Sequence, residues 1–280
     1  PVWFFLGIQK MRYITILNMS GRICTMLGIF LLVKTPEDYI LAAFLQACTP
    51  LIAGIFSIVW LSKHYTGLFK WPTIGEIINS YKEGWSIFVS SLAVNLYTAT
   101  NIVVLGMLTN NVIVGYYSAA DKLIICVRRG IYAVSDAIYP FISKMMKDDI
   151  PKGLQFIKKQ LFLYLIVGVV GCTSLFFFSD TIVRLLFGAD YDLTFDVLRI
   201  LSFVPLAVAI STVFGEETML PLNMNSAYSR TLVLAAFFSL LSIFPLCYLW
   251  GAKGVAMTML LTEFLIMIIM GGLLRKQLFQ

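Results

Sequence analysis

Ser118-Ala-Ala-Asp121-Lys122-Leu-Ile-Ile-Cys-Val-Arg128-Arg129-Gly-Ile-Tyr132-Ala-Val-Ser135-Asp136 places two acids and three bases inside a long apolar part of the chain. At about 100° per residue, helical spacing gathers the polar side chains within an arc of roughly 140°. They are Ser118, Asp121, Lys122, Arg128, Arg129, Tyr132, Ser135 and Asp136. In a membrane, such charges must face a protein interior or a watery cavity, because each would cost several kcal/mol in hydrocarbon. The stretch therefore predicts a polar path through the protein, and a polar path indicates transport.

The composition indicates the class of protein. The chain is 59% hydrophobic and 13% charged, whereas soluble domains are about 25% charged. The mean hydropathy is +0.87. The net charge of +6 does not indicate nucleic-acid binding, because the basic residues are not gathered into a solvated patch with interleaved aromatic residues. We therefore expect an all-α integral membrane protein.

Cysteine and histidine are too few and too scattered to suggest a metal site. The five cysteines lie within or beside apolar runs without a C-x-x-C pair, and His64 is the single histidine. We expect the cysteines to act as small apolar residues, and we expect no metal or cofactor. The chain opens with Pro1 in an apolar run, so we expect an N-terminally truncated chain that begins partway through a membrane span.

Apolar runs of about 20 residues predict about eight complete membrane spans. They are Ile14–Val33, Tyr39–Leu61, Trp85–Leu108, Val112–Phe141, Leu161–Phe178, Val197–Phe214, Thr231–Leu249 and Gly254–Leu274, with a partial span at Pro1–Ile8. Hydropathy drops between residues 62 and 84, which predicts a linker between two lobes. Within this linker Ile74, Ile77, Ile78 and Tyr81 keep helical spacing, as in an amphipathic helix lying on a membrane surface.

The distribution of basic residues predicts the orientation of the chain. With alternating crossings, one set of connections holds thirteen Lys and Arg residues and the opposite set holds four. By the positive-inside rule, the first set is cytoplasmic, and so are the 62–84 linker and the C-terminus.

Two further spans contribute candidate cavity residues. Thr15, Asn18, Arg22 and Thr25 fall within an arc of about 80° in the first complete span. Arg22 lies roughly 12 Å deep at about 1.5 Å per residue, which is long for snorkelling to a headgroup, so we favour a role in the lumen. In the third span, Asn95 shares a face with Ser91 and Thr98, and Asn101 is near.

These polar residues allow two interpretations. The bases of residues 118–136 could contact a substrate, or they could pair with Asp121 and Asp136 and hold helices together. Asn95 and Asn101 could bind sugar hydroxyls or join helices. Because Glu263 offsets one of the intramembrane bases, we expect a slightly positive cavity. The expected cavity residues are Asn18, Arg22, Asn95, Asn101, Asp121, Lys122, Arg128, Arg129 and Asp136.

Several segments resemble a known family. Residues 1–15, Pro-Val-Trp3-Phe-Phe-Leu6-Gly-Ile-Gln9-Lys-Met11-Arg-Tyr13-Ile-Thr15, resemble the W-F-F-Q-G-x-E-x-M-x-Y-I-T signature of bacterial polysaccharide and O-antigen repeat-unit flippases. These belong to the superfamily of multidrug, oligosaccharidyl-lipid and polysaccharide exporters. Leu6 and Gln9 depart from the Gln and Glu of the signature. Residues 114–122, 139–144 and 215–224 are similar to the family's V-G-Y-Y-S-A-A-x-K, P-x-I-S-K and G-x-Q-x-M-L-P-L-G segments.

The resemblance implies a protein of two six-helix lobes. Residues 1–61 would be the remnant of the N-terminal lobe, and residues 85–280 the complete C-terminal lobe. It also implies that the protein translocates an undecaprenyl-diphosphate-linked oligosaccharide repeat unit across the bacterial inner membrane, by alternating access through a cationic central cavity.

Roles for the candidate residues follow from this implied function. Arg22 and Arg128 or Arg129 would bind the diphosphate with Lys122 in support, and Asn95 and Asn101 would bind sugar. Membrane lipids and other polysaccharide assembly proteins would be partners. A cation-coupled multidrug antiporter of the same superfamily is the alternative. An enzyme is not expected, because the loops are short and no nucleophile–base pair can be read.

Overall fold

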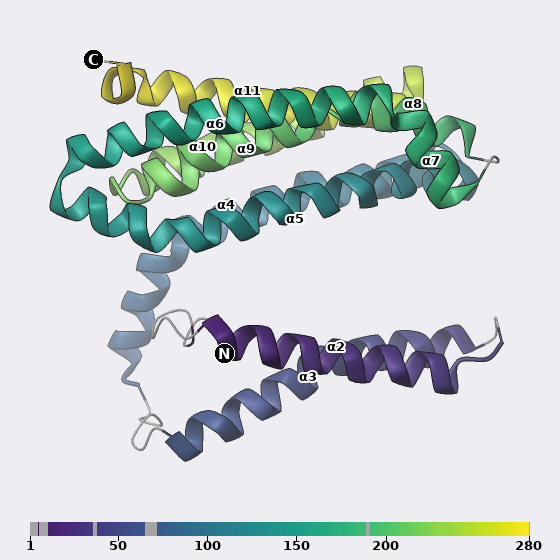
Figure 1. The fold of residues 1–280 in the computed structure, drawn as a ribbon, viewed down its shortest axis with the longest axis horizontal. Coiled ribbons are helices and arrows are strands. Elements are labelled where there is room, and N and C mark those ends of the chain that lie inside the picture. Colours follow the sequence, from purple (N-terminus) through teal and green to yellow (C-terminus); the bar gives the residue numbers. More distant parts are fainter. Residues whose placement is uncertain (1–4, 6–10, 36–37, 65–71, 189–190, 280) are drawn as a thin grey trace. The chain divides into compact units, whose positions relative to one another are not determined.

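The structure, a computed structural model, describes residues 5, 11–35, 38–64, 72–188 and 191–279, and its regular elements in these ranges are all helices (Figure 1). They are α2 (Met11–Leu32), α3 (Tyr39–His64), α4 (Ile74–Leu108), α5 (Asn111–Asp148), α6 (Ile150–Phe177), α7 (Ser179–Phe187), α8 (Asp192–Leu201), α9 (Val204–Phe214), the π-helix η2 (Gly215–Met219), α10 (Asn225–Trp250) and α11 (Ala252–Phe279). The all-α prediction is confirmed.

Six helical segments of the described chain are long and apolar enough to cross a membrane. They are Ile40–Lys63, Ile87–Leu108, Ile150–Phe177, Leu193–Met219, Asn225–Trp250 and Ala252–Arg275. Two of the eight predicted spans are not among them. In α2 only Met19–Leu32 is an apolar helix, and α5, although 38 residues long, carries the charges of residues 118–136. The protein is therefore a multi-pass integral membrane protein, and the full count of eight spans stays a prediction.

Apolar side chains on the outer face of α10 illustrate the contact with lipid. Leu234, Phe237, Leu241, Phe244 and Tyr248 are all exposed. Their spacing of three and four residues places them on one face of the helix. An exposed apolar stripe of this length is costly in water and favourable against acyl chains.

The chain divides into two compact units, residues 1–76 and 77–280. In the first unit, α2 and α3 form a helical hairpin (Figure 1). The Thr25 and Thr49 hydroxyls hydrogen-bond to each other between these two helices. The lobe boundaries predicted at residues 61 and 84 stay a prediction.

Helix α4 begins with a capping box. The Glu76 carboxylate accepts hydrogen bonds from the Thr73 backbone N–H at 2.8 Å and from the Thr73 hydroxyl at 2.9 Å. The Thr73 N–H lowers the pKa of Glu76, because the bond favours the charged carboxylate. From this start α4 runs without interruption to Leu108. The predicted amphipathic segment at Ile74–Tyr81 is thus helical, but it is the first part of α4 rather than a separate short helix.

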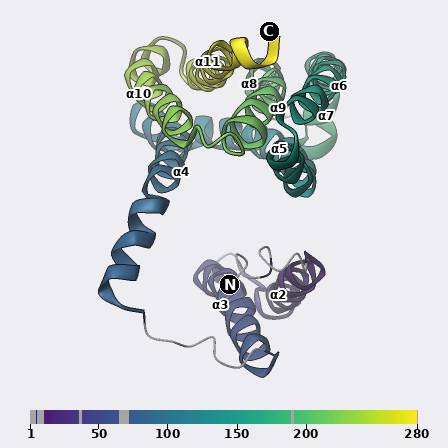
Figure 2. The ribbon, with the colours of Figure 1, turned by 90° about the vertical axis from the view of Figure 1, so that its left-hand side faces the viewer.

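The second unit is a bundle whose long helices Figure 2 views nearly along their axes. Helices α5 and α6 extend beyond the predicted spans and meet at Asp149, whose carboxylate caps α6 by accepting the Lys152 N–H. The segment between the predicted spans that end at Phe141 and begin at Leu161 is therefore mostly helical. It continues the two spans rather than separating them.

The predicted span at Val197–Phe214 is interrupted. Helix α8 ends at Leu201 and α9 begins at Val204, with Pro205 in its first turn. Proline lacks the N–H that would continue α8 and restricts the preceding residue, so the break falls here. Between the predicted spans that end at Phe178 and begin at Val197, the chain forms the short helix α7.

Helices α10 and α11 form a close hairpin. Gly251 turns the chain with a φ of +54°, a value that favours glycine. At Gly254, a Cβ would fall against the carbonyl oxygen of Leu246. The core of the unit consists of two clusters of buried apolar residues, one including Leu105, Ile124 and Leu198 and the other including Ile142, Ile157 and Met270.

Candidate substrate-binding site

The polar arc of α5 separates into two stripes. Asp121, Arg128 and Ser135 are seven residues apart, and they are half-buried, buried and buried respectively. Lys122, Arg129 and Asp136 repeat the same spacing one residue later, and all three are exposed. Seven residues are close to two helical turns, so each set follows one line along the helix. The first stripe therefore faces the bundle, and the second lies at its margin.

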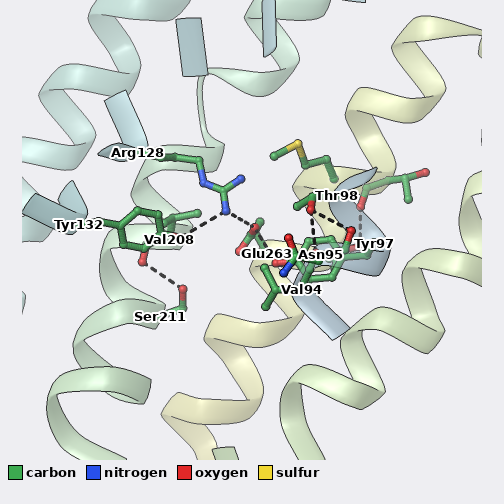
Figure 3. Close-up of polar contacts among 12 residues, drawn as sticks. Val94, Asn95, Tyr97, Thr98, Arg128, Tyr132, Val208, Ser211 and Glu263 are labelled. Carbon is green, nitrogen blue, oxygen red and sulfur yellow. Dashed lines mark hydrogen bonds and ion pairs between the residues drawn. The ribbon is translucent and has the colours of Figure 1, made fainter. Parts of the chain in front are cut away.

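Arg128 is the centre of a buried polar network (Figure 3). Its Nη2 lies 3.4 Å from the Glu263 Oε1 of α11 and 3.3 Å from the Tyr132 hydroxyl of α5. The Tyr97 hydroxyl of α4 donates to the same Glu263 oxygen at 3.1 Å. The network thus joins α4, α5 and α11, and it neutralises the buried guanidinium with Glu263 rather than with Asp121 or Asp136.

A cavity of about 420 Å³ opens beside this network. Its polar lining includes Ser91, Asn95, Asp136, Tyr139, Glu216 and Tyr228. Among the described lining residues there are two carboxylates and neither a lysine nor an arginine. Asp136 from α5 and Glu216 from η2 line the wall of the same cavity. The charge at this cavity is therefore negative, whereas the sequence led us to expect a slightly positive one.

A smaller cavity of about 50 Å³ extends the first one inward. The two share Val94, Glu216, Tyr228 and Leu232, and the smaller cavity also reaches Glu263. Polar groups therefore follow one another from Asp136 at the larger cavity to the Arg128–Glu263 pair.

The two adjacent acids of the π-helix η2, Glu216 and Glu217, have different surroundings. Glu216 lines both cavities. Glu217 is 0% exposed, and its Oε1 accepts a 2.6 Å hydrogen bond from Ser135. Single π-turns inside apolar helices are frequent at functional sites. One feature of the sequence marks both residues, a pair of acids within an apolar run, but helical periodicity cannot assign either one to a cavity.

The two asparagines of α4 have different surroundings. Asn95 lines the cavity, and its Nδ2 donates to the Ser91 carbonyl at 2.8 Å. Asn101 is 2% exposed, its Oδ1 has no hydrogen-bond partner among the described residues, and its neighbours Val104 and Leu105 belong to the apolar core. The structure therefore brings Asn95 and Asp136 together at the cavity but does not bring Asn101 to it.

Arg22 belongs to the first unit, where it lines a separate cavity of about 400 Å³ with Thr25, Gln46 and Thr49. The side chain of Asn18 lies outside the described residues. A meeting of Arg22 with the bases of α5 stays a prediction. No group of three or more His, Cys, Asp or Glu side chains within the described ranges could hold a metal ion.

Together, the apolar helices and the inward-facing polar groups define a multi-pass membrane protein with a polar cavity in its second unit. Residues 1–146 match the family described as "Polysaccharide biosynthesis protein". The chain belongs to this family of polysaccharide and O-antigen flippases.

Curated relatives agree with this family. The chain is 30% identical over 272 residues to the "Putative O-antigen transporter" of Escherichia coli (strain K12), covering 95% of this chain and 64% of the relative. It is also 30% identical over 271 residues to the protein of the same description from Shigella dysenteriae, with 96% and 67% coverage. A more distant relative, 24% identical over 243 residues, is the "Probable low-salt glycan biosynthesis flippase Agl15" of Haloferax volcanii, with 86% and 50% coverage. The chain thus spans about two thirds of the length of the first two relatives. No solved structure matches it.

Proposed function

We propose that this protein moves an undecaprenyl-diphosphate-linked oligosaccharide repeat unit across the bacterial inner membrane, and that the sugars pass through the cavity lined by Asn95, Asp136 and Glu216. The observation that carries the proposal is this polar cavity in a chain of the polysaccharide flippase family. Its volume of about 420 Å³ falls within the range of small-molecule sites.

The lining of the cavity suits a sugar. Sugar hydroxyls both donate and accept hydrogen bonds, and the Asn95 amide and the Ser91 hydroxyl can do the same. The carboxylates of Asp136 and Glu216 accept strong hydrogen bonds from hydroxyl groups. Tyr139 and Tyr228 add an apolar ring with a polar end.

We assign the diphosphate to bases outside this cavity. Arg128 is committed to Glu263, whereas Arg22, Lys122 and Arg129 are exposed and have no ion-pair partner among the described residues. An exposed guanidinium or ammonium can meet a lipid headgroup phosphate without first giving up a buried partner. We therefore propose Arg22 in the first unit, and Lys122 and Arg129 in the second, as the bases available to the diphosphate.

The transport cycle that we propose is alternating access between two lobes, with the C-terminus in the cytoplasm. The polyprenyl tail stays in lipid while the glycan crosses through the polar passage. The carrier lipid and other polysaccharide assembly proteins are the proposed partners, and the chemistry of the substrate is unchanged by the transfer, as in a transporter rather than an enzyme.

Reconstitution tests this function. The protein is placed in liposomes with a fluorescent undecaprenyl-diphosphate-linked oligosaccharide, and a glycan-cleaving enzyme is added outside. We expect the protein to expose inner-leaflet glycan to cleavage, and Arg129→Ala to slow that exposure. Lys144→Ala, which removes another exposed base of α5, is the matched control. Cleavage no greater than in protein-free liposomes would refute the proposed function.

The acidic lining also favours a second candidate, the cation-coupled multidrug antiporter. Two carboxylates without a base at the cavity would attract an organic cation. Export of a quaternary ammonium dye from the same liposomes, without movement of the glycan, would select this function instead.

A further inference from the structure

The charge of the larger cavity limits which glycans it can admit. Asp136 from α5 and Glu216 from η2 contribute two carboxylates to its wall, and the remaining described lining residues are uncharged. The buried base of the adjoining network, Arg128, pairs with Glu263 at 3.4 Å and is not among the lining residues. A ligand in this cavity therefore meets net negative charge.

We propose that the cavity selects repeat units whose sugars carry no negative charge, with neutral and amine-bearing sugars admitted and uronic or other acidic sugars disfavoured. This inference rests on the proposed function, because it names the substrate class of the same cavity. It differs from a general affinity for glycans, since it predicts discrimination between sugars that differ only in one carboxylate.

The physical basis is repulsion in a partly dehydrated space. A cavity of about 420 Å³ is so small that a sugar ring inside it lies close to the Asp136 carboxylate, to the Glu216 carboxylate or to both. An acidic sugar would place a further negative charge beside the carboxyl groups of Asp136 and Glu216. Like charges a few ångströms apart repel much more strongly there than in water, so we expect about a tenfold or greater loss of affinity. Neutral sugars avoid this repulsion and donate their hydroxyl hydrogens to the same carboxylates.

An alternative occupant of an acidic cavity is an organic cation. The family to which the chain belongs favours a glycan, and the amide and hydroxyl groups of Asn95 and Ser91 provide hydrogen bonds that a quaternary ammonium ion cannot use. We therefore commit to a glycan without negative charge and make the cation an outcome of the test.

The test measures binding to the purified chain in lipid nanodiscs. The probes are a neutral oligosaccharide, the same oligosaccharide with one hexose oxidised to the uronic acid, the same with one amino sugar, and a quaternary ammonium dye. We expect the neutral and amine-bearing probes to bind about tenfold or more tightly than the uronic acid at low ionic strength. Added salt should narrow this ratio, because mobile ions screen the repulsion.

Variants that neutralise the two carboxylates test whether the discrimination against acidic sugars arises in this cavity. Asp136→Asn combined with Glu216→Gln should bring the uronic acid close to the neutral probe in affinity. Asp180→Asn, which removes an exposed acid of α7 paired with Arg184, should leave the ratio unchanged. Thermal unfolding of each variant checks that it is folded, and the salt dependence of the unmodified protein tests the inference without any substitution.

The outcomes separate the inference from the function on which it rests. Equal or tighter binding of the uronic acid by the unmodified protein, while all sugars bind, overturns the charge selection alone. An unchanged ratio in the folded double variant overturns the role of Asp136 and Glu216. Binding of the dye with no binding of any sugar overturns both the selection and the proposed function.

Discussion

The Arg128 guanidinium on α5 lies 3.4 Å from the Glu263 carboxylate on α11, and both side chains are nearly excluded from solvent. These residues are far apart in the sequence, and Tyr97 of α4 donates to the same carboxylate oxygen. A buried charge is tolerated only when it is paired and hydrogen-bonded. The pair therefore fixes three helices at one point beside the cavity.

Glu263→Gln should destabilise the protein strongly. The substitution keeps the shape of the side chain but leaves the Arg128 charge buried without a counter-charge, which costs about 3–5 kcal/mol in unfolding free energy. Chemical denaturation in detergent measures this loss. Lys152→Ala breaks the exposed pair with Asp149 and should leave the unfolding free energy nearly unchanged, because solvent screens this pair. Equal effects of the two substitutions would show that the buried pair does not hold the helices.

The sequence was sufficient for the class of fold and for most of the helices. Apolar runs long enough to cross a membrane have few alternatives, because backbone groups in lipid must be satisfied within a helix. The ends of the helices were harder to predict. Polar residues 143–160 resemble a connection, yet α5 and α6 continue through them and turn only at Asp149.

Helical periodicity alone cannot predict which charged residues pair with each other. Spacing along α5 groups Arg128 with Arg129, but only packing decides that Arg128 faces Glu263 while Arg129 is exposed. Neither could spacing predict that a π-turn places Glu216 at the cavity and Glu217 in the interior. A sum of the charges inside the predicted spans predicted a slightly positive cavity, whereas the described lining is acidic because the basic side chains do not line it.

Glu217→Gln should be tolerated. The Glu217 Oε2 has no hydrogen-bond partner among the described residues, and no described base forms an ion pair with this side chain. Glutamine keeps an acceptor for the Ser135 hydroxyl and removes a charge from the interior, so unfolding free energy should stay equal or rise by up to about 2 kcal/mol.

Ser135→Ala provides the contrast to Glu217→Gln. It removes the 2.6 Å donor and leaves the Glu217 carboxylate without this bond, which should lower the unfolding free energy by about 1–3 kcal/mol. Denaturation curves of both variants compare them directly. If Glu217→Gln lowered the unfolding free energy more than Ser135→Ala did, the interior would require the negative charge of Glu217.

Gly254→Ala should loosen the hairpin of α10 and α11. The added Cβ would fall against the Leu246 carbonyl oxygen, and because the obstacle is backbone, the helices must separate. Overpacking of this kind costs about 1–3 kcal/mol. Gly272→Ala on the same helix meets nothing within 4 Å and should gain up to about 1 kcal/mol from helix propensity. The thermal unfolding temperature should therefore fall for Gly254→Ala and rise for Gly272→Ala. Shifts of both temperatures in the same direction would contradict the close approach at Gly254.

The two asparagines of α4 should differ in function although their side chains are identical. Asn95→Leu removes an amide that lines the cavity and should weaken binding of a neutral oligosaccharide by about threefold to tenfold, the effect of one lost hydrogen bond. Asn101→Leu places an apolar group among Val104 and Leu105 and should leave oligosaccharide affinity unchanged, because Asn101 does not line the cavity. Titration of both purified variants measures the difference. Weaker binding in Asn101→Leu than in Asn95→Leu would place the sugar near the core end of α4, where the described cavity does not reach.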